Sequence, residues 1–152
     1  MARRRLLSFV LLVPLALGGV PSSKGAAVSA ASVARPSLNV QASRYGAILF
    51  DGRGYVLYAF TRDARGRPSC YGPCARRWPP YLVKSRPSAG PGANASFVGV
   101  IRRRDGRLQA TYAGRPLYYY VGDTAPRLIL CQSVSEFGRI WLVVRGSGKP
   151  VR

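Results

Sequence analysis

The sequence predicts a mainly β protein, in which two related antiparallel hairpin or meander repeats pack as one small domain with little helix. Short segments rich in aromatic and β-branched residues alternate with Gly, Pro and Asp along residues 45–145. Asp51-Gly52 and Asp105-Gly106 are typical hairpin turns, because Gly accepts the positive φ that such turns demand. The second half of the chain also repeats the first at a spacing of 60 residues. A spacing of this size indicates duplication of one supersecondary unit.

The predicted elements follow from these segments. The expected strands are residues 45–50, 55–61, 81–84, 97–102, 108–112, 116–121 and 140–145. No segment shows a sustained helical period, so we expect at most one turn of helix, at residues 73–78. The predicted organisation is a signal peptide (1–34), a flexible N-terminal segment (35–44), a first repeat (45–84), a linker loop (85–95), a second repeat (96–145) and a tail (146–152).

The N-terminus is typical of an export signal. Three arginines at positions 3–5 precede an apolar run at residues 6–20, and small residues follow it. Small-x-small cleavage points occur at Val28-Ser29-Ala30 and Ser32-Val33-Ala34. An uncleaved anchor is the alternative, but Pro14 interrupts the run, which is shorter than the roughly 20 residues that a spanning helix needs. We therefore expect a secreted or periplasmic envelope protein whose mature chain has no transmembrane helix.

The charge is strongly positive. The chain has 24 Lys and Arg residues against 5 Asp and Glu. Cleavage before Arg35 would remove Arg3, Arg4, Arg5 and Lys24, so that the net charge would fall from +19 to +15. Such a surface favours anionic envelope polymers or lipid headgroups as partners, with no specific nucleic acid implied. A solvated surface from an arginine-rich proteome is the alternative.

One motif occurs in both halves. Tyr58, Phe60 and Asp63 in the first copy match Tyr118, Tyr120 and Asp123 in the second. Because strand side chains alternate between faces, the aromatic residues of each copy should share one face. Each aspartate should close a turn by accepting the backbone N–H two residues further on. A metal-binding or catalytic role for the aspartates is the alternative.

These residues carry a family resemblance. Both copies fit Tyr-x-(Phe/Trp/Tyr)-x-x-Asp, and residues 70–80 fit Cys-x-Gly-x-Cys-Ala-x-x-Trp-Pro-Pro. Together they resemble the bacterial "secreted repeat of unknown function" family of predicted lipoproteins, over residues 45–144. The resemblance implies an exported, envelope-associated protein with no established activity. This chain departs from the family in having no lipobox cysteine, so lipid anchoring is not expected, and in having Arg127-Leu128-Ile129-Leu130-Cys131 where a Gly- and Asp-rich stretch is usual.

The three cysteines are Cys70, Cys74 and Cys131. In an oxidising compartment a disulfide is the default, and we favour Cys70–Cys74 with Cys131 free and buried. A disulfide that closes this short loop adds about 2 kcal/mol to the free energy of unfolding, whereas a disulfide that includes Cys131 would close a longer loop and add about 4 kcal/mol. Thiol redox chemistry or soft-metal binding by the cysteines is the alternative.

Catalysis has little support in the sequence. The chain contains no histidine, and four of its five acids stand at predicted turns. We expect no enzyme, no metal site and no cofactor. Trp78-Pro79-Pro80 and Tyr118-Tyr119-Tyr120 could stack on sugars or bases, although core packing is the favoured use of Trp78 and Trp141. The leading hypothesis is a non-enzymatic binding or structural module of the cell envelope, with a thiol-redox or soft-metal-binding protein as the alternative.

Overall fold

The computed structural model describes residues 36–152, so the predicted signal peptide at residues 1–34 and Arg35 lie outside the described residues. The described part is mainly β with one short helix, which confirms the predicted fold class. The strands are β1 (Ser37–Ser43), β2 (Gly46–Asp51), β3 (Tyr58–Phe60), β4 (Leu82–Val83), β5 (Ser88–Ala89), β6 (Val98–Arg102), β7 (Leu108–Tyr112), β8 (Arg115–Pro116), β9 (Val134–Glu136) and β10 (Arg139–Val143), and the helix is α1 (Pro73–Arg77).

Each repeat begins with an antiparallel hairpin. In the first, β1 pairs with β2 from Leu38↔Asp51 to Ser43↔Gly46. In the second, β6 pairs with β7 from Val98↔Tyr112 to Arg102↔Leu108. The prediction of a flexible segment at residues 35–44 is therefore wrong for most of its length. The reason is that Leu38 is fully buried and the ladder with β2 satisfies the backbone of β1.

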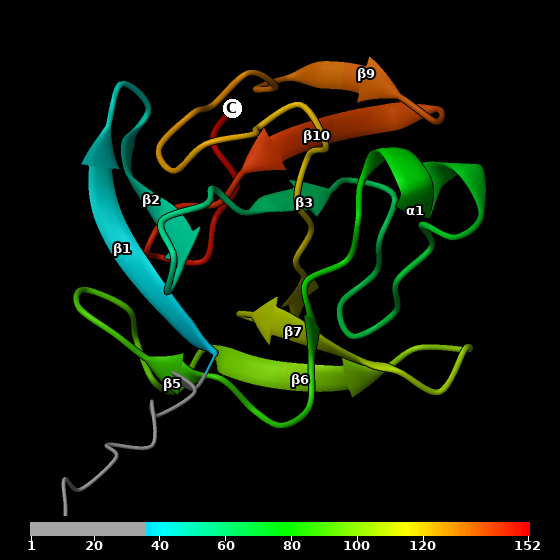
Figure 1. The fold of residues 1–152 in the computed structure, drawn as a ribbon, viewed down its shortest axis with the longest axis horizontal. Coiled ribbons are helices and arrows are strands. Elements are labelled where there is room, and N and C mark those ends of the chain that lie inside the picture. Colours follow the sequence, from blue (N-terminus) through cyan, green and yellow to red (C-terminus); the bar gives the residue numbers. More distant parts are fainter. Residues whose placement is uncertain (1–35) are drawn as a thin grey trace, which may run out of the picture. The chain divides into compact units, whose positions relative to one another are not determined.

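The last strand of each repeat pairs with the other repeat. β4 lies beside β7, with Leu82 opposite Gln109 and Val83 opposite Leu108. In return, β10 lies beside β3, and the Leu49 N–H of β2 donates to the Val144 carbonyl at 2.8 Å. Figure 1 shows β3 lying between β10 above it and the β6–β7 hairpin below it. The two repeats thus exchange strands, and each hairpin is hydrogen-bonded to a segment that comes from the other repeat.

Two predicted irregular segments are more ordered than expected. The predicted linker at residues 85–95 contains β5, which pairs in parallel with the start of β1. The predicted tail at residues 146–152 folds back, since Val144 bridges Pro150 and the buried Val151 donates its N–H to the Val143 carbonyl at 2.9 Å. Both segments cover backbone or apolar groups that the hairpins leave open.

The predicted strand at residues 116–121 is mostly irregular, and β9 was not expected. Tyr118 bridges Tyr58 on one side and Pro80 on the other, so this segment crosses between two neighbours without running along either of them. β9 carries little apolar character, and its pairing with β10 comes from tertiary context.

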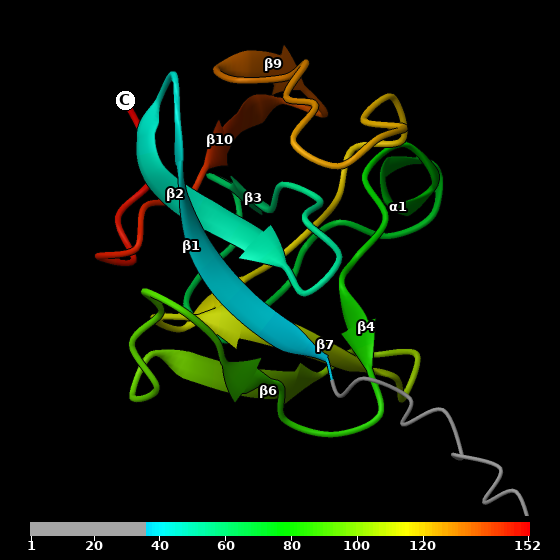
Figure 2. The same cartoon turned by 60° about the vertical axis from the view of Figure 1, so that its left-hand side comes forward.

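The core consists of two clusters, one on each face of the motif segments. The first contains the motif aromatic residues with Trp78 and Trp141. The second contains Leu57, Ala59 and Leu117 together with residues of the two hairpins. In Figure 2 the β1–β2 hairpin extends from near β10 down to the level of β6 and β7. Burial of these two clusters requires both repeats.

Candidate functional site

The motif aromatic residues face one cluster, as their strand period predicts. Tyr58, Phe60 and Tyr118 are buried there, and Tyr120 packs partly buried against them. The neighbours Leu57 and Leu117 lie in the other cluster. Alternation along an extended backbone accounts for this division.

The tyrosines and aspartates of the motif bond across the repeats. The Tyr58 hydroxyl donates to Asp123 Oδ2 at 2.6 Å, and the Tyr118 hydroxyl donates to Asp63 Oδ2 at 2.7 Å. Between them the backbones of Tyr58 and Tyr118 exchange two N–H···O=C bonds, each 2.9 Å long. The motif therefore forms one reciprocal joint, in which each repeat supplies the tyrosine for the aspartate of the other.

The expected local role of the aspartates is wrong. Neither carboxylate accepts the N–H two residues further on, and the backbone closes the turns that lead into them, because Asp63 N–H donates to Phe60 O and Asp123 N–H donates to Tyr120 O, both at 3.1 Å. This leaves the carboxylates free to act further away. Asp63 Oδ1 accepts from the Ser69 N–H and hydroxyl, and Asp123 Oδ1 accepts from the Leu130 N–H, so each carboxylate also fixes the loop that follows it.

Burial controls the protonation of this joint. Desolvation raises the pKa of Asp63 and of Asp123 above the ordinary value, while the hydrogen bonds from Tyr118 and Tyr58 oppose that rise. Desolvation is also the largest cause that raises the pKa of both tyrosines, with the facing carboxylates adding to it. The hydroxyls therefore remain donors at neutral pH, which suits a structural clamp better than proton transfer.

The two tryptophans stack at the centre of the first cluster. Their ring centroids are 4.0 Å apart with planes 3° from parallel, and both side chains are fully buried. Trp78 Nε1 donates to Glu136 Oε2 at 2.7 Å, whereas Trp141 Nε1 has no partner among the described residues. Both rings are core, so the stacking surface considered for Trp78 is not available to a ligand.

The predicted Cys70–Cys74 disulfide is confirmed, and Cys131 is a free, buried thiol. Cys70 follows the Ser69 that binds Asp63, and Cys131 follows the Leu130 that binds Asp123. Cys131 is thus the counterpart of Cys70 in the second repeat, without a second cysteine nearby in sequence to pair with. Burial is the largest cause that raises the pKa of the Cys131 thiol, which disfavours the reactive thiolate.

An arginine from each hairpin reaches the loop that follows the aspartate of the other repeat. Arg103 Nη2 donates to the Cys70 carbonyl at 2.7 Å, and Arg44 Nη2 donates to the Ile129 carbonyl at 2.6 Å. The side chain of Arg103 is fully enclosed and also donates to Gln109, whereas Arg44 is exposed. Sequence reasoning missed this pair, although the 60-residue spacing nearly aligns the two positions.

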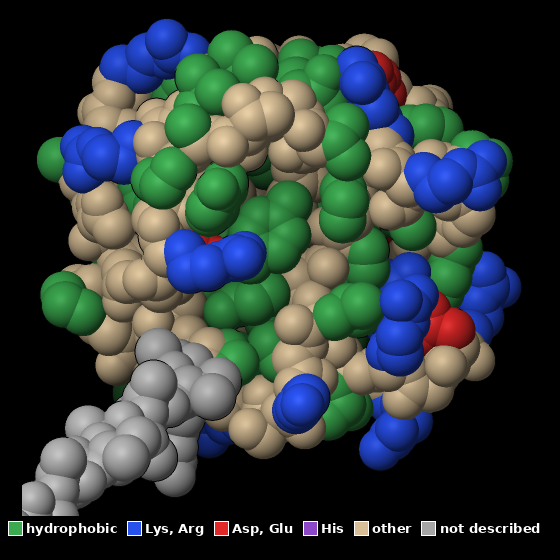
Figure 3. Space-filling model, in the orientation of Figure 1, with side chains coloured by type: hydrophobic (Ala, Val, Ile, Leu, Met, Phe, Trp, Pro, Cys, Tyr) green, Lys and Arg blue, Asp and Glu red, His purple; other side chains and the backbone are tan. Residues whose placement is uncertain are grey.

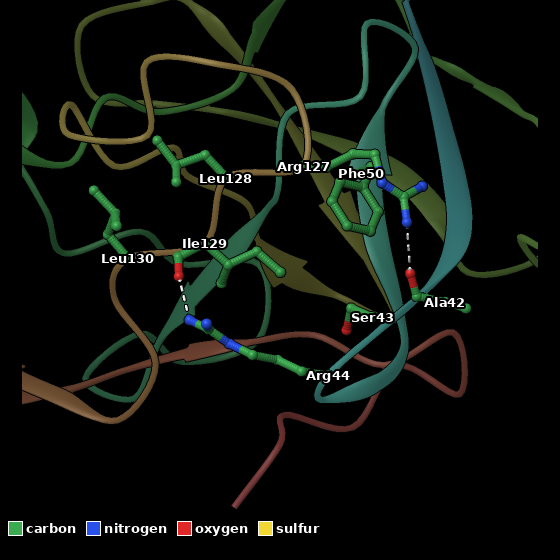
Figure 4. A pocket seen from close by; sticks show the side chains of 8 residues that line it. All are labelled: Ala42, Ser43, Arg44, Phe50, Arg127, Leu128, Ile129 and Leu130. Carbon is green, nitrogen blue, oxygen red and sulfur yellow. Dashed lines mark hydrogen bonds between the residues drawn. The ribbon is translucent and has the colours of Figure 1, made fainter.

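Arg44 borders an open hollow of about 310 Å³ between the β1–β2 hairpin and the loop that follows Asp123. Figure 4 shows Arg44 and Arg127 approaching it from different segments, with Phe50, Leu128 and Ile129 forming apolar walls. Both guanidiniums are already bonded to carbonyls, of Ile129 and of Ala42 respectively. These bonds hold the loop at residues 127–130 against the β1–β2 hairpin, so both arginines already have a structural role at this hollow.

Asp51 organises another hollow, of about 530 Å³. The buried Asp51 carboxylate caps its own turn by accepting the N–H groups of Arg53 and Tyr55. It also accepts from Arg53 Nε and the Tyr119 hydroxyl, both at 2.9 Å. Every oxygen of this acid is occupied from within, and within residues 36–152 no group of three or more His, Cys, Asp or Glu side chains could hold a metal ion.

The fold and this joint define a class of two-repeat β-protein whose halves exchange strands and aspartate partners. A family model described as "Secreted repeat of unknown function" matches residues 40–81 and again residues 99–145. The chain therefore belongs to this secreted repeat family, and each motif copy falls within one of the matched segments. Neither a curated protein nor a solved structure matches the chain. In the described residues no helix is long and apolar enough to cross a membrane.

Replacing Tyr58 with Phe should leave the buried Asp123 carboxylate with one bond fewer. We expect the free energy of unfolding to fall by about 1.5–3 kcal/mol in a urea titration. The pKa of Asp123, followed by NMR, should rise further, because the hydroxyl bond now lowers it. Because the pKa of Asp123 in the folded protein lies above the unfolded value of about 3.9, its contribution to the free energy of unfolding is full below that value and is lost as the pH rises through the folded pKa. In the variant this loss should extend to higher pH, because the folded pKa is higher still. Tyr45→Phe is the control and should change neither quantity.

The single free thiol, that of Cys131, should be far less accessible to a thiol reagent in the native protein than in the unfolded protein. In native protein we expect Cys131 to react slowly with a thiol reagent, and one thiol per chain to react in urea. Reductant should raise the denatured count to three. Fast native labelling of Cys131 would revive the thiol-redox hypothesis.

Proposed function

We propose that this protein is a non-enzymatic binding module of the bacterial cell envelope that holds anionic polymers through its arginine and lysine side chains. The observation that carries the proposal is the use of its acids. All five acidic residues of the chain lie in the described part and accept hydrogen bonds from other residues of the protein: Asp51, Asp63, Asp105, Asp123 and Glu136. Every negatively charged side chain therefore has a partner within the protein, while most positively charged side chains have no carboxylate partner.

The ion pairs illustrate this imbalance. Among residues 36–152 only Arg53, Arg77, Arg103 and Arg107 lie within salt-bridge distance of a carboxylate. Figure 3 shows Lys and Arg side chains dispersed over one face, with the few acidic side chains lying beside arginines. Dispersed cations without internal partners attract polyanions by long-range electrostatics.

The absence of histidine from the sequence and the internal use of every carboxylate support a non-enzymatic role. A general base needs a side chain free to take a proton near neutral pH. The tyrosines and aspartates of the joint already satisfy one another in a buried setting. The family description as a secreted repeat agrees with an envelope location.

Retention on isolated bacterial cell walls tests this proposal. Purified protein that comprises residues 36–152 should be retained at low salt and released steeply as NaCl rises past roughly 0.15 M, because screening shortens the reach of exposed charges. A variant with Arg62, Arg67 and Arg76 changed to Gln removes exposed charge without breaking an ion pair, and should elute at lower salt. Retention that ignores salt, or no retention at low salt, would contradict the proposal.

A further inference from the structure

A hollow of about 380 Å³ lies where four chain segments meet. These are the loop after Asp63, the two residues before β6, the turn between β7 and β8 with the start of β8, and the turn that follows β10. Three of them contribute one cationic side chain each, namely Arg65, Arg115 and Lys149. None of the described residues that line the hollow is acidic. Three cations therefore share one concave site without a counter-charge in its wall.

Glycines bring these segments close enough to form the wall. A Cβ on Gly148 would overlap Ala113, so only glycine lets the C-terminal turn approach the β7–β8 turn this closely. The Gly66 N–H donates to the Gly114 carbonyl at 2.8 Å, which fixes the loop that carries Arg65. In Figure 2 the red C-terminal turn and the yellow turn after β7 lie on the same side of the molecule. Backbone contacts within the protein thus hold the wall of the hollow in place.

Arg115 is the anchored member of the set. Its Nε donates to the Gly148 carbonyl at 3.2 Å, and its other guanidinium nitrogens have no partner among the described residues. Burial, and then the like charges of Arg65 and Arg152, lowers the pKa of Arg115. A guanidinium held among other cations gains most from an anion that bridges them.

We propose that this hollow binds a phosphate group of an envelope polymer, held by the guanidiniums of Arg65 and Arg115 and the ammonium of Lys149. Guanidinium forks match the geometry of phosphate oxygens, and a lysine adds a mobile point charge. The Phe97 ring in the wall offers an apolar surface to the part of the polymer next to the phosphate. This inference rests on the proposed function, and narrows it from general polyanion binding to one site and one group.

Two matched variants test the site, with inorganic pyrophosphate as the probe. Arg65→Gln with Lys149→Gln removes one Arg and one Lys from the hollow, and both are exposed. Arg76→Gln with Lys84→Gln removes the same charges from elsewhere on the surface. NMR titration of the wild type should give saturable shifts at the amides of Gly114, Arg115 and Gly148. The hollow variant should bind about tenfold more weakly and the control less than twofold. Equal weakening, or no saturable shift in the wild type, would overturn the inference.

Cell-wall retention and vesicle retention separate the outcomes. If walls retain the wild type but pyrophosphate binding shows no preference for the hollow, the site fails and the proposed function stands. If pyrophosphate occupies the hollow but walls do not retain the protein, the proposed function fails and the phosphate site stands. On phosphatidylglycerol vesicles, the hollow variant and the control variant should be retained more weakly than the wild type, and by the same amount. A selective loss of the hollow variant on vesicles would replace the polymer by a lipid headgroup and overturn the assignment.

Discussion

The contact between Tyr58 and Tyr118 is the interaction on which the rest of the structure depends. At this point the two repeats exchange a pair of backbone hydrogen bonds, and each tyrosine hydroxyl reaches the aspartate of the other repeat. Each aspartate in turn holds the loop that follows it. One joint therefore sets the positions of four segments that are distant in sequence, and the tryptophan stack packs directly against it.

The strand exchange follows from the same joint. Once the motif segments lie side by side, the chain after each of them is directed onto the other repeat, as β4 pairs with β7, β10 pairs with β3, and Val144, directly after β10, accepts a hydrogen bond from β2. The aromatic face of the motif then closes one core cluster and the aliphatic face closes the other. This arrangement also brings Arg65, Arg115 and Lys149 together, since they come from both repeats and from the C-terminal turn.

Local sequence patterns predicted much of the fold, but they did not predict the contacts between residues that are distant in sequence. The Asp105-Gly106 hairpin turn, the faces of Tyr58 and Phe60, and the Cys70–Cys74 disulfide follow from short-range geometry and spacing. The partner of Asp63 did not, because a turn aspartate usually bonds locally and nothing in one repeat alone indicates a tyrosine 55 residues away. The order of β1 escaped for a similar reason, since its burial depends on packing against both repeats. The cationic hollow needed the fold, because its three charged residues are scattered along the chain.

Neither repeat is expected to fold without the other. The most direct test expresses residues 36–95 and 96–152 as separate chains and follows near-UV circular dichroism, which reports the packed tryptophans. Each fragment alone should lack the near-UV signal and a cooperative urea transition, because its joint, exchanged strand and core faces are unpaired. An equimolar mixture should recover both. A fragment that unfolds cooperatively by itself, with a native-like near-UV spectrum, would show that the repeats do not depend on each other to fold.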